Sequence, residues 1–428
     1  MRFDKVTLVG LVLAAMLPAT QALAQDDGAL LREGLFKRDR NVSVTERPKP
    51  EYNPITMHFG SFSVLPSITG TVEENDNIYA TKTNTTSDTI FRVSPAVVAK
   101  SNWNRHALSL FANLTRDFYS SHSSEETTDY LVGFDGRLDV AHDLGFAGGA
   151  SYERDTEPRT SSSSPVGATK PVQFDVARAY GEGAYATNRI RLSGRVSIDD
   201  YSFDNTTTSG GATITEKDRD HTEWKESAKL EYALVPDTSV FVQAIVNQRS
   251  YRNAQVGETL RDSNGYTLHV GANFDLSHLI RGEIGVGYLS QDYDAAIYSK
   301  SSGFSFAGLV EWFPTQLTTV TFSGNRGVED AGIPSVGGYL STNGAVSIDH
   351  ELLRNIVLNG GLTYGKDEYQ NYDRTDERTG AHVGLKYLMN RAVTINVAYN
   401  YYKQDSSGSK LGAQFDVNRV YASLAYAF

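Results

Sequence analysis

The sequence contains no cysteine among its 428 residues. This absence excludes disulfide bonds and thiolate metal sites, and it excludes lipid attachment to a cysteine at a mature N-terminus. Side-chain packing, hydrogen bonds and ion pairs must therefore stabilise the fold.

Long hydrophobic runs are absent after the first segment of the chain. Residues 6–17 are apolar, follow Arg2 and Lys5, and precede the small-x-small sequence Ala22-Leu23-Ala24. This pattern predicts a signal peptide over residues 1–24, cleaved before Gln25. No later stretch approaches about 18 uninterrupted apolar residues, which excludes insertion into a membrane as helices.

Positive charge is in deficit. The chain has 40 Lys and Arg against 51 Asp and Glu, a net charge of −11 and a pI of about 5.4. A nucleic-acid partner would need a basic face, so nucleic acid is excluded. Acidic loops at a cell surface suit divalent cations that bridge to phosphates, so lipopolysaccharide of an outer membrane is an expected partner.

Proline is scarce, with 12 residues, whereas the chain has 24 Tyr, 19 Phe and 37 Gly. Aromatic residues suit half-buried strands and the girdles of membrane barrels. The mean hydropathy of −0.36 is too polar for a helical membrane protein. A transmembrane β-barrel resolves the conflict, because only alternate residues of each strand face lipid.

Strand-like segments follow one another in pairs over residues 58–428, joined alternately by a short turn and a long polar loop. Short turns are expected at residues 103–105, 142–144, 188, 235–237, 278–279, 314–317, 353–354 and 390–391. Long loops are expected at residues 81–88, 121–128, 156–173, 204–220, 252–264, 294–302, 328–337, 366–378 and 404–417. These connections predict an all-β, antiparallel up-and-down barrel of 18 strands with both termini periplasmic.

Alternation of apolar and polar residues supports these strands. It is clear over residues 190–198, 266–276 and 393–401, where the apolar members are expected to face lipid. Segments 174–187 and 303–313 lack a cleanly polar face, which leaves 16 strands as the alternative count.

The chain closes on the alternating strand NRVYASLAYAF, residues 418–428. Tyr426 and Phe428 fall on its apolar face, where a terminal aromatic can lie in the interfacial girdle with its carboxylate in water. A final Phe of this kind resembles the signal that the barrel-assembly machinery reads, so that machinery is an expected partner. An ordinary amphipathic edge strand is the alternative.

Residues 25–57 differ from the rest of the chain. They contain a mixed charge run and Pro48, Pro50 and Pro54, which predicts an extended periplasmic arm before the barrel of residues 58–428. A disordered leader is the alternative.

Three stretches near the start of the mature chain carry a family resemblance. They are RDRNVSVTERPKPEYNP (38–54), GSFSVLPSITGTVEENDNIYAT (60–81) and FRVSPAVVAKSNWNRHAL (91–108). They resemble the opening of the putative β-barrel porin 2 family of Gram-negative outer-membrane proteins. The resemblance implies an outlet for surface polysaccharide beside a periplasmic export protein, and it brings no catalytic residues.

Catalytic and metal-binding patterns are missing. The nine histidines are scattered, and neither HExxH, His-x-His nor GxSxG occurs. His269 and His382 are expected to face inward on strands far apart in sequence. We therefore expect no enzyme activity, no cofactor and no metal site.

The lumen is the remaining candidate site. Acidic residues near 117–139 and basic residues near 178–195 could separate charge across a pore, or they could pair across strands and keep the lumen wet. The expected lumen-lining residues are Arg92, Lys100, Asp117, Asp135, Arg137, Asp139, Arg178, Glu182, Arg191, Arg195, Asp199, Lys225, Lys229, Glu231, Asp275, Asp349 and Lys386.

Eighteen strands enclose a space too wide for side chains to fill. The sequence therefore predicts a channel for polar solutes or, by resemblance, a polysaccharide outlet, with loops 156–173 and 204–220 or the arm as occluding segments. Phe111 and Tyr119 are candidate sugar-stacking platforms. The alternative is a structural or adhesive barrel with a closed lumen and functional outer loops.

Overall fold

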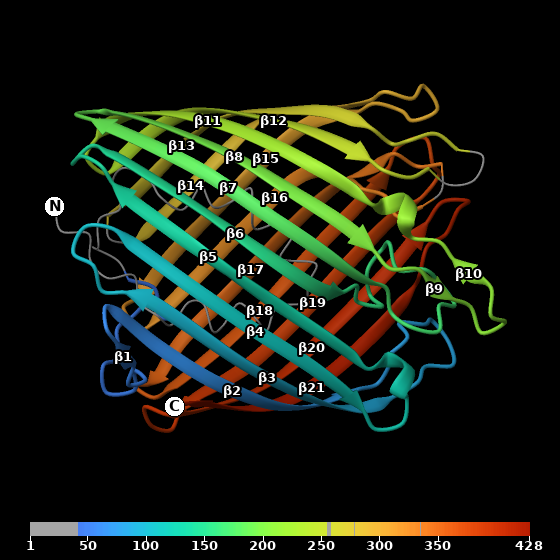
Figure 1. The fold of residues 1–428 in the computed structure, drawn as a ribbon, viewed down its shortest axis with the longest axis horizontal. Coiled ribbons are helices and arrows are strands. Elements are labelled where there is room, and N and C mark those ends of the chain that lie inside the picture. Colours follow the sequence, from blue (N-terminus) through green and yellow to red (C-terminus); the bar gives the residue numbers. More distant parts are fainter. Residues whose placement is uncertain (1–41, 255–257, 278, 334) are drawn as a thin grey trace.

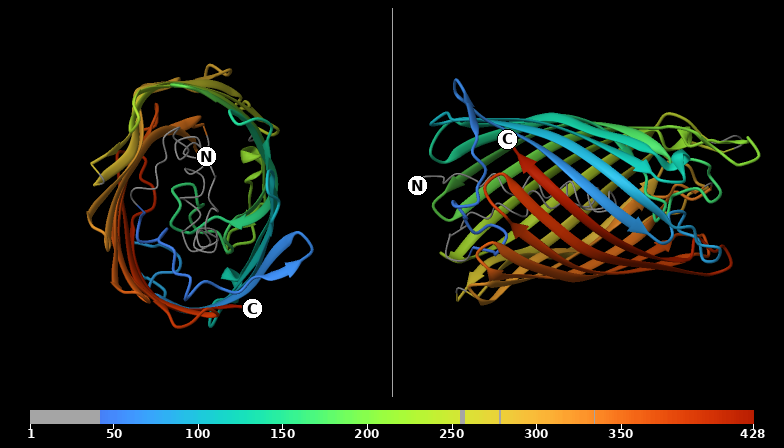
Figure 2. Two further views of the ribbon diagram at one scale, coloured as in Figure 1. Left: turned by 90° about the vertical axis from the view of Figure 1, so that its left-hand side faces the viewer. Right: turned by 90° about the horizontal axis from the view of Figure 1, so that it is seen from below.

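The computed structural model describes residues 42–254, 258–277, 279–333 and 335–428. Its main element is one antiparallel sheet closed into a barrel, with an oval cross-section when seen along the axis (Figures 1 and 2). Each strand of the wall pairs with the next wall strand along the chain, in one place across a separate small hairpin, and the last strand pairs with the first strand of the wall.

Eighteen strands make the wall. In chain order they are β2 (Phe62–Asn75), β3 (Asp88–Ser101), β4 (Ala107–Tyr119), β5 (Thr127–Asp139), β6 (Leu144–Thr156), β7 (Gln173–Thr187), β8 (Ile190–Phe203), β11 (His221–Val235), β12 (Thr238–Tyr251), β13 (Ser263–Leu276), β14 (Ile280–Tyr293), β15 (Ser301–Thr315), β16 (Thr318–Asp330), β17 (Gly338–Leu353), β18 (Ile356–Tyr369), β19 (Thr375–Leu388), β20 (Val393–Ser407) and β21 (Phe415–Ala427).

Smaller elements lie at the two ends of the barrel. A short strand β1 (Met57–Phe59) folds back on the start of β2. The loop between β8 and β11 carries the hairpin of β9 (Thr206–Thr207) and β10 (Thr213–Ile214). Single 3-10 turns lie at η4 (Ser123–Glu125) and η5 (Lys217–Arg219). Among the described residues, no helix is long and apolar enough to cross a membrane.

The connections confirm the predicted 18-stranded antiparallel barrel. All eight short turns and all nine long loops fall between strands where they were expected, and the alternative of 16 strands is wrong. Segments 174–187 and 303–313 are the strands β7 and β15. Alternation is weak in β7 because Phe174 and Val176 belong to a buried cluster with Phe203 and Val172, so the inner face is apolar there.

Some strands are longer than expected. The loops predicted at 366–378 and 404–417 shrink to residues 370–374 and 408–414, because β18, β19 and β20 extend into charged sequence. In these extensions polar side chains occupy both faces, so hydrophobic alternation cannot mark the ends of the strands.

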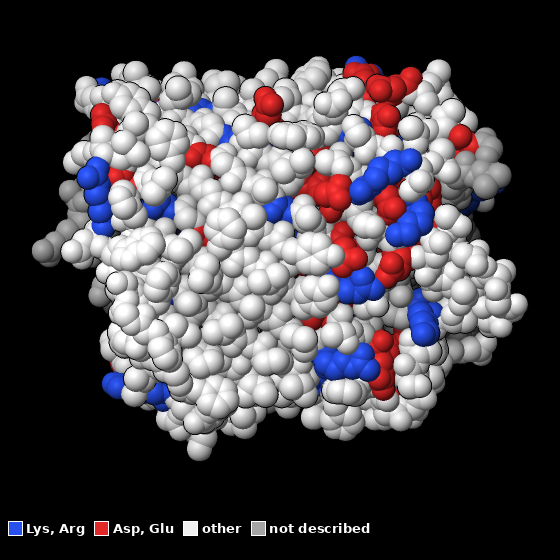
Figure 3. Space-filling model, viewed as in Figure 1, with Lys and Arg blue, Asp and Glu red and all other residues white. Residues whose placement is uncertain are grey.

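The outer face of the barrel is an apolar band bordered by charge. Figure 3 shows a wide area without charged side chains, beyond which acidic and basic residues gather toward the long-loop end. Trp224 and Tyr232 lie exposed eight residues apart on β11. That separation is about 26 Å along the strand and about 20 Å along the axis at a tilt of about 40°, close to the apolar thickness of an outer membrane.

The C-terminal strand closes the barrel at the short-turn end (Figure 1). Ser67 lies opposite Ala427, and the Phe428 amide donates to the Pro66 carbonyl at 3.1 Å. The rings of Tyr426 and Phe428 are exposed on the outer face and meet edge to face, with centroids 5.0 Å apart.

Candidate functional site

The inner face of the wall is identified by segment 42–56, which lies inside the barrel at the short-turn end (Figure 2). The Val44 amide donates to the Thr319 hydroxyl at 3.0 Å, and the Lys49 ammonium lies 3.7 Å from the Glu351 carboxylate. Side chains of residues paired across neighbouring strands lie on the same face of a sheet. The inner face can therefore be followed from Thr319 and Glu351 around the whole barrel.

The residues predicted to line the lumen all lie on this inner face. Their positions follow from the strand registers: Arg92 and Lys100 on β3, Asp117 on β4, Asp135, Arg137 and Asp139 on β5, Arg178 and Glu182 on β7, Arg191, Arg195 and Asp199 on β8, Lys225, Lys229 and Glu231 on β11, Asp275 on β13, Asp349 on β17 and Lys386 on β19. That they border a path for solutes stays a prediction.

Most of these charges are paired across strands. Arg92 makes a bidentate contact with Asp117, with both N···O distances at 2.7 Å. Arg195 lies 3.5 Å from Glu182, and Arg178 contacts both Asp199 and Glu153. The structure therefore shows the pairing alternative rather than a separation of charge across the pore.

Two lysines are exceptions to this pairing. Within the described part of the chain, neither Lys100 nor Lys386 lies within ion-pair distance of a carboxylate. Lys386 pairs with Val357 on β18, and Val357 pairs with Glu351 on β17, the residue that contacts Lys49. Lys386 thus adds positive charge to the wall near the segment that holds Lys49.

The wall of β11 to β14 is closely packed. Lys229 is almost completely buried, donates to Glu283 at 2.5 Å, and lies 4.1 Å from the centre of the Phe241 ring. Glu231 accepts from the Ser239 hydroxyl at 3.0 Å. These charges are held by hydrogen bonds, so they are fixed parts of the wall.

The loop between β6 and β7, residues 157–172, crosses the interior of the barrel. Figure 2 shows it inside the outline of the wall. At its start Arg159 pairs with Glu125 at 2.7 Å. At its tip the Ser162 hydroxyl donates at 3.1 Å to Asp367 on β18, a strand far around the barrel. This loop therefore lies inside the lumen near the long-loop end, and its role as an occluding segment stays a prediction.

The loop between β8 and β11 holds the crossing loop in place. Arg219 makes two hydrogen bonds of 3.0 Å to Glu157, and a third to Glu216. Burial opposes the charge of this guanidinium, but the carboxylates of Glu157, Glu216 and Asp330 together raise the pKa of Arg219. Ala168 forms a β-bridge with Thr208, which attaches the β9–β10 hairpin to the same loop.

Segment 42–56 is fixed at the opposite end by charge. Glu351, nearly buried on β17, lies within 3.7 Å of Arg47, Lys49 and Arg354. Lys49 is only 7% exposed. Burial lowers the pKa of its ammonium, although Glu351 opposes that shift. The rest of the predicted arm and the signal peptide, residues 1–41, lie outside the described residues.

Sequence reasoning missed one cluster. His221 is the first residue of β11 and lies between the rings of Tyr201 and Tyr251, with centroid distances of 4.6 and 4.9 Å. The Tyr251 hydroxyl donates to Asp330 at 2.5 Å. The aromatic residues come from three adjacent strands, and only the register brings them together.

The inner histidines predicted from sequence lie apart. His269 contacts the Ser305 hydroxyl at 2.9 Å, whereas His382 lies on β19, across the sheet from Gly361. In the described residues, no group of three or more His, Asp or Glu side chains could hold a metal ion.

A closed antiparallel barrel with an apolar outer band and an ion-paired interior defines an outer-membrane β-barrel protein of a Gram-negative bacterium. The chain belongs to the family described as Putative beta-barrel porin 2, whose model matches residues 49–428. No curated protein matches the sequence.

The chain is similar to several solved structures at low identity. OccAB3 of Acinetobacter baumannii is 9% identical, with 86% of this chain and 100% of that chain covered and a TM-score of 0.47. A BenF-like porin from Pseudomonas fluorescens Pf-5 is 10% identical, with 86% of this chain and 100% of that chain covered and a TM-score of 0.47. OccK2 (OpdF) of Pseudomonas aeruginosa, solved in complex with glucuronate, is 12% identical. The match covers 85% of this chain and 98% of that chain, with a TM-score of 0.45.

Proposed function

We propose that the protein is a passive outer-membrane channel for small polar solutes. The polar, ion-paired inner wall of an 18-stranded barrel carries this proposal. A barrel of this size cannot be filled by the side chains of its own strands, and hydrogen-bonding groups fixed along a wide interior suit hydrated solutes. Paired charges give donors and acceptors without a strong field of one sign.

Two segments would control passage. The β6–β7 loop narrows the barrel near the long-loop end, where Ser162 reaches Asp367. Segment 42–56 occupies part of the short-turn end, where Glu351 holds Arg47 and Lys49. A solute that enters from either side would meet one of these segments before the wall between them.

The test is the single-channel conductance of purified protein in a planar bilayer, with folding checked by heat-modifiable gel mobility. The full-length protein is compared with a variant that lacks residues 25–57. Steady current from the full-length protein would support an open channel. Current from the deletion variant alone would also support a channel, with the arm as its plug. The absence of current from both folded proteins would overturn the proposal.

The outlet for surface polysaccharide, implied by the resemblance, stays a prediction, and so do its periplasmic export partner and the structural or adhesive barrel. If the deletion variant still sustains full output of surface polysaccharide, the arm has no docking role in export. Two silent but folded barrels would favour the structural or adhesive alternative.

A further inference from the structure

A hollow of about 130 Å³ lies in the inner wall between β4 and β8. Two rows of paired residues form it. One row runs from Phe111 through Gly133, Ser151 and Arg178 to Asp199. In this row the small residues Gly133 and Ser151 lie side by side between the large residues Phe111 and Arg178, so the wall is recessed at Ser151.

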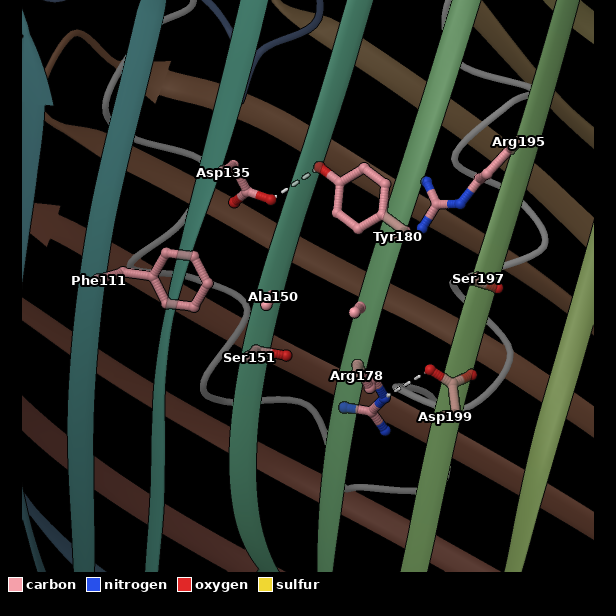
Figure 4. A pocket seen from close by; sticks show the side chains of 10 residues that line it. Phe111, Asp135, Ala150, Ser151, Arg178, Tyr180, Arg195, Ser197 and Asp199 are labelled. Atoms are coloured by element: carbon pink, nitrogen blue, oxygen red, sulfur yellow. Dashed lines mark hydrogen bonds and ion pairs between the residues drawn. The ribbon is translucent and has the colours of Figure 1, made fainter.

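The second row runs beside the first. It passes from Asp135 through Gly149 and Tyr180 to Ser197. Two aromatic rings therefore border the hollow from different strands, and Figure 4 shows Phe111 and Tyr180 on either side of the strand that carries Ser151.

Two glycines allow the rings to lie against the sheet. A Cβ on Gly133 would stand 2.6 Å from Cζ of Phe111, and a Cβ on Gly149 would stand 2.9 Å from Cε1 of Tyr180. Neither distance is tolerable for a real side chain, so glycine is needed at both positions. The rings are thus held as fixed faces beside the recess.

The polar groups around the hollow are held in place as well. The Tyr180 hydroxyl donates to Oδ1 of Asp135 at 2.8 Å. The Arg195 guanidinium lies 4.1 Å from the centre of the Tyr180 ring, and Arg178 lies 3.9 Å from Asp199. The lining contains two arginines and two aspartates, so its formal charge is zero.

From this arrangement we propose that the hollow is a binding subsite for a neutral sugar on its way through the barrel. This proposal rests on the proposed channel function. Sugar rings have apolar faces that pack on aromatic rings, and their hydroxyl groups both donate and accept hydrogen bonds. The fixed aromatic rings, with guanidinium donors, carboxylate acceptors and serine hydroxyls beside them, match both properties. A site for an ionic solute would instead carry net charge of the opposite sign.

The size of the hollow limits what it holds. At about 30 Å³ of liquid volume for each water, it has room for about four waters. It therefore takes part of one sugar ring, and the rest of a longer saccharide would project into the lumen.

The test measures maltose binding to the folded full-length protein by isothermal titration calorimetry. The variants are Phe111→Ala, which removes one aromatic face, and Ser151→Leu, which fills the recess. Tyr180→Phe keeps the ring and removes its hydrogen bond to Asp135. The matched control is Phe134→Ala, which removes an aromatic ring from the outer face of β5, next to Gly133. Gluconate and lysine serve as charged probes.

We expect maltose to bind the parent and Phe134→Ala proteins equally, and Phe111→Ala and Ser151→Leu to weaken binding about fivefold or more. If Phe111→Ala does not fold, Ser151→Leu and Tyr180→Phe decide. The proposal is overturned if the folded parent protein does not bind maltose, if the hollow variants bind it unchanged, or if a charged probe binds more tightly.

Conductance of the same preparations separates this proposal from the proposed function. Ion current without maltose binding would overturn the sugar subsite and leave the channel intact. Maltose binding that the hollow variants weaken, in a barrel that never conducts, would overturn the channel and leave the sugar site.

Discussion

The Ser162 hydroxyl, carried by the loop between β6 and β7, donates to the Asp367 carboxylate on β18 at 3.1 Å. Asp367 is completely buried and also accepts from Ser341 and Arg378, both at 2.8 Å. The wall alone therefore fixes the position of this carboxylate, independently of the loop. Together with the hydrogen bond from Arg374 to the Ser162 carbonyl at 3.2 Å, this contact connects two distant parts of the barrel.

Removing this hydrogen bond should loosen the loop. For Ser162→Ala we expect more frequent transitions to a higher conductance level in single-channel records. A hydrogen bond to a charged group contributes about 1.5 kcal/mol or more, which corresponds to an about tenfold change in the open population. Ser164→Ala in the same loop is the control and should behave as the parent protein. Identical records for both variants would show that the loop does not limit the current.

Glu351 should hold segment 42–56 in the barrel. Replacing it in Glu351→Gln removes the carboxylate shared by Arg47, Lys49 and Arg354. We expect faster proteolysis of the segment in detergent-folded protein, with the barrel itself still resistant. Glu377→Gln, a substitution outside this cluster, is the control. Unchanged proteolysis would mean that the backbone contact of Val44 with Thr319 is sufficient.

Docking of the same segment should depend on pH through Lys49. Burial lowers the pKa of its ammonium from the usual 10.5 in the docked state. The docked form therefore binds fewer protons between the lowered pKa and 10.5, and docking should strengthen as pH rises through that window. Fluorescence anisotropy of a dye on Thr45→Cys reports docking. Adding Lys49→Met should remove the rise, and a fall with increasing pH would contradict the assignment.

The orientation of the barrel can be tested by labelling, because the sequence has no native cysteine. Val166, 84% exposed in the β6–β7 loop, and Met389, exposed at the turn between β19 and β20, lie at opposite ends. On intact cells we expect a membrane-impermeant maleimide to label Val166→Cys and to spare Met389→Cys. Both should react after lysis. Labelling of Met389→Cys alone would reverse the topology.

Gly133 should be needed for stability. In Gly133→Ala the new Cβ would stand 2.6 Å from Phe111 and 2.8 Å from the Ala150 carbonyl oxygen. Since backbone cannot move away easily, we expect a loss of about 1–3 kcal/mol in unfolding free energy, measured by urea titration in lipid vesicles. Gly303→Ala, where a Cβ meets nothing within 4 Å, is the control. Equal stability of the two variants would mean that the sheet relaxes around the methyl group.

Most of the barrel wall could be predicted from the sequence, because its strands lie between lipid and a wet interior. Residues 266–276 alternate for that reason, and they form β13 with the expected inner and outer faces. The same rule fails where loops cover the inner face, as at Phe174 and Val176. There the inner face is apolar whereas Asp175 lies on the other face, so the usual pattern of a polar inner face and an apolar outer face disappears.

The packing of the interior could not be predicted in the same way. The contacts of Ser162 with Asp367 and of Lys49 with Glu351 join residues 205 and 302 positions apart. Such pairs depend on the path of a loop or arm through space, which has no repeat in the sequence. The hollow beside Phe111 likewise requires the register of five strands.

The pairing of β2 with β21 makes this barrel a ring that its last segment completes. Asn75 lies opposite Arg419, and the Pro66 carbonyl accepts a hydrogen bond from the Phe428 amide. Until residues 415–428 arrive, the wall is an open sheet with two unsatisfied edges, which lipid cannot solvate. Loss of that final strand would therefore leave a curved sheet exposed to aggregation and quality-control proteases, rather than a slightly narrower pore. Release of a closed barrel into the membrane must wait until β21 has paired with β2.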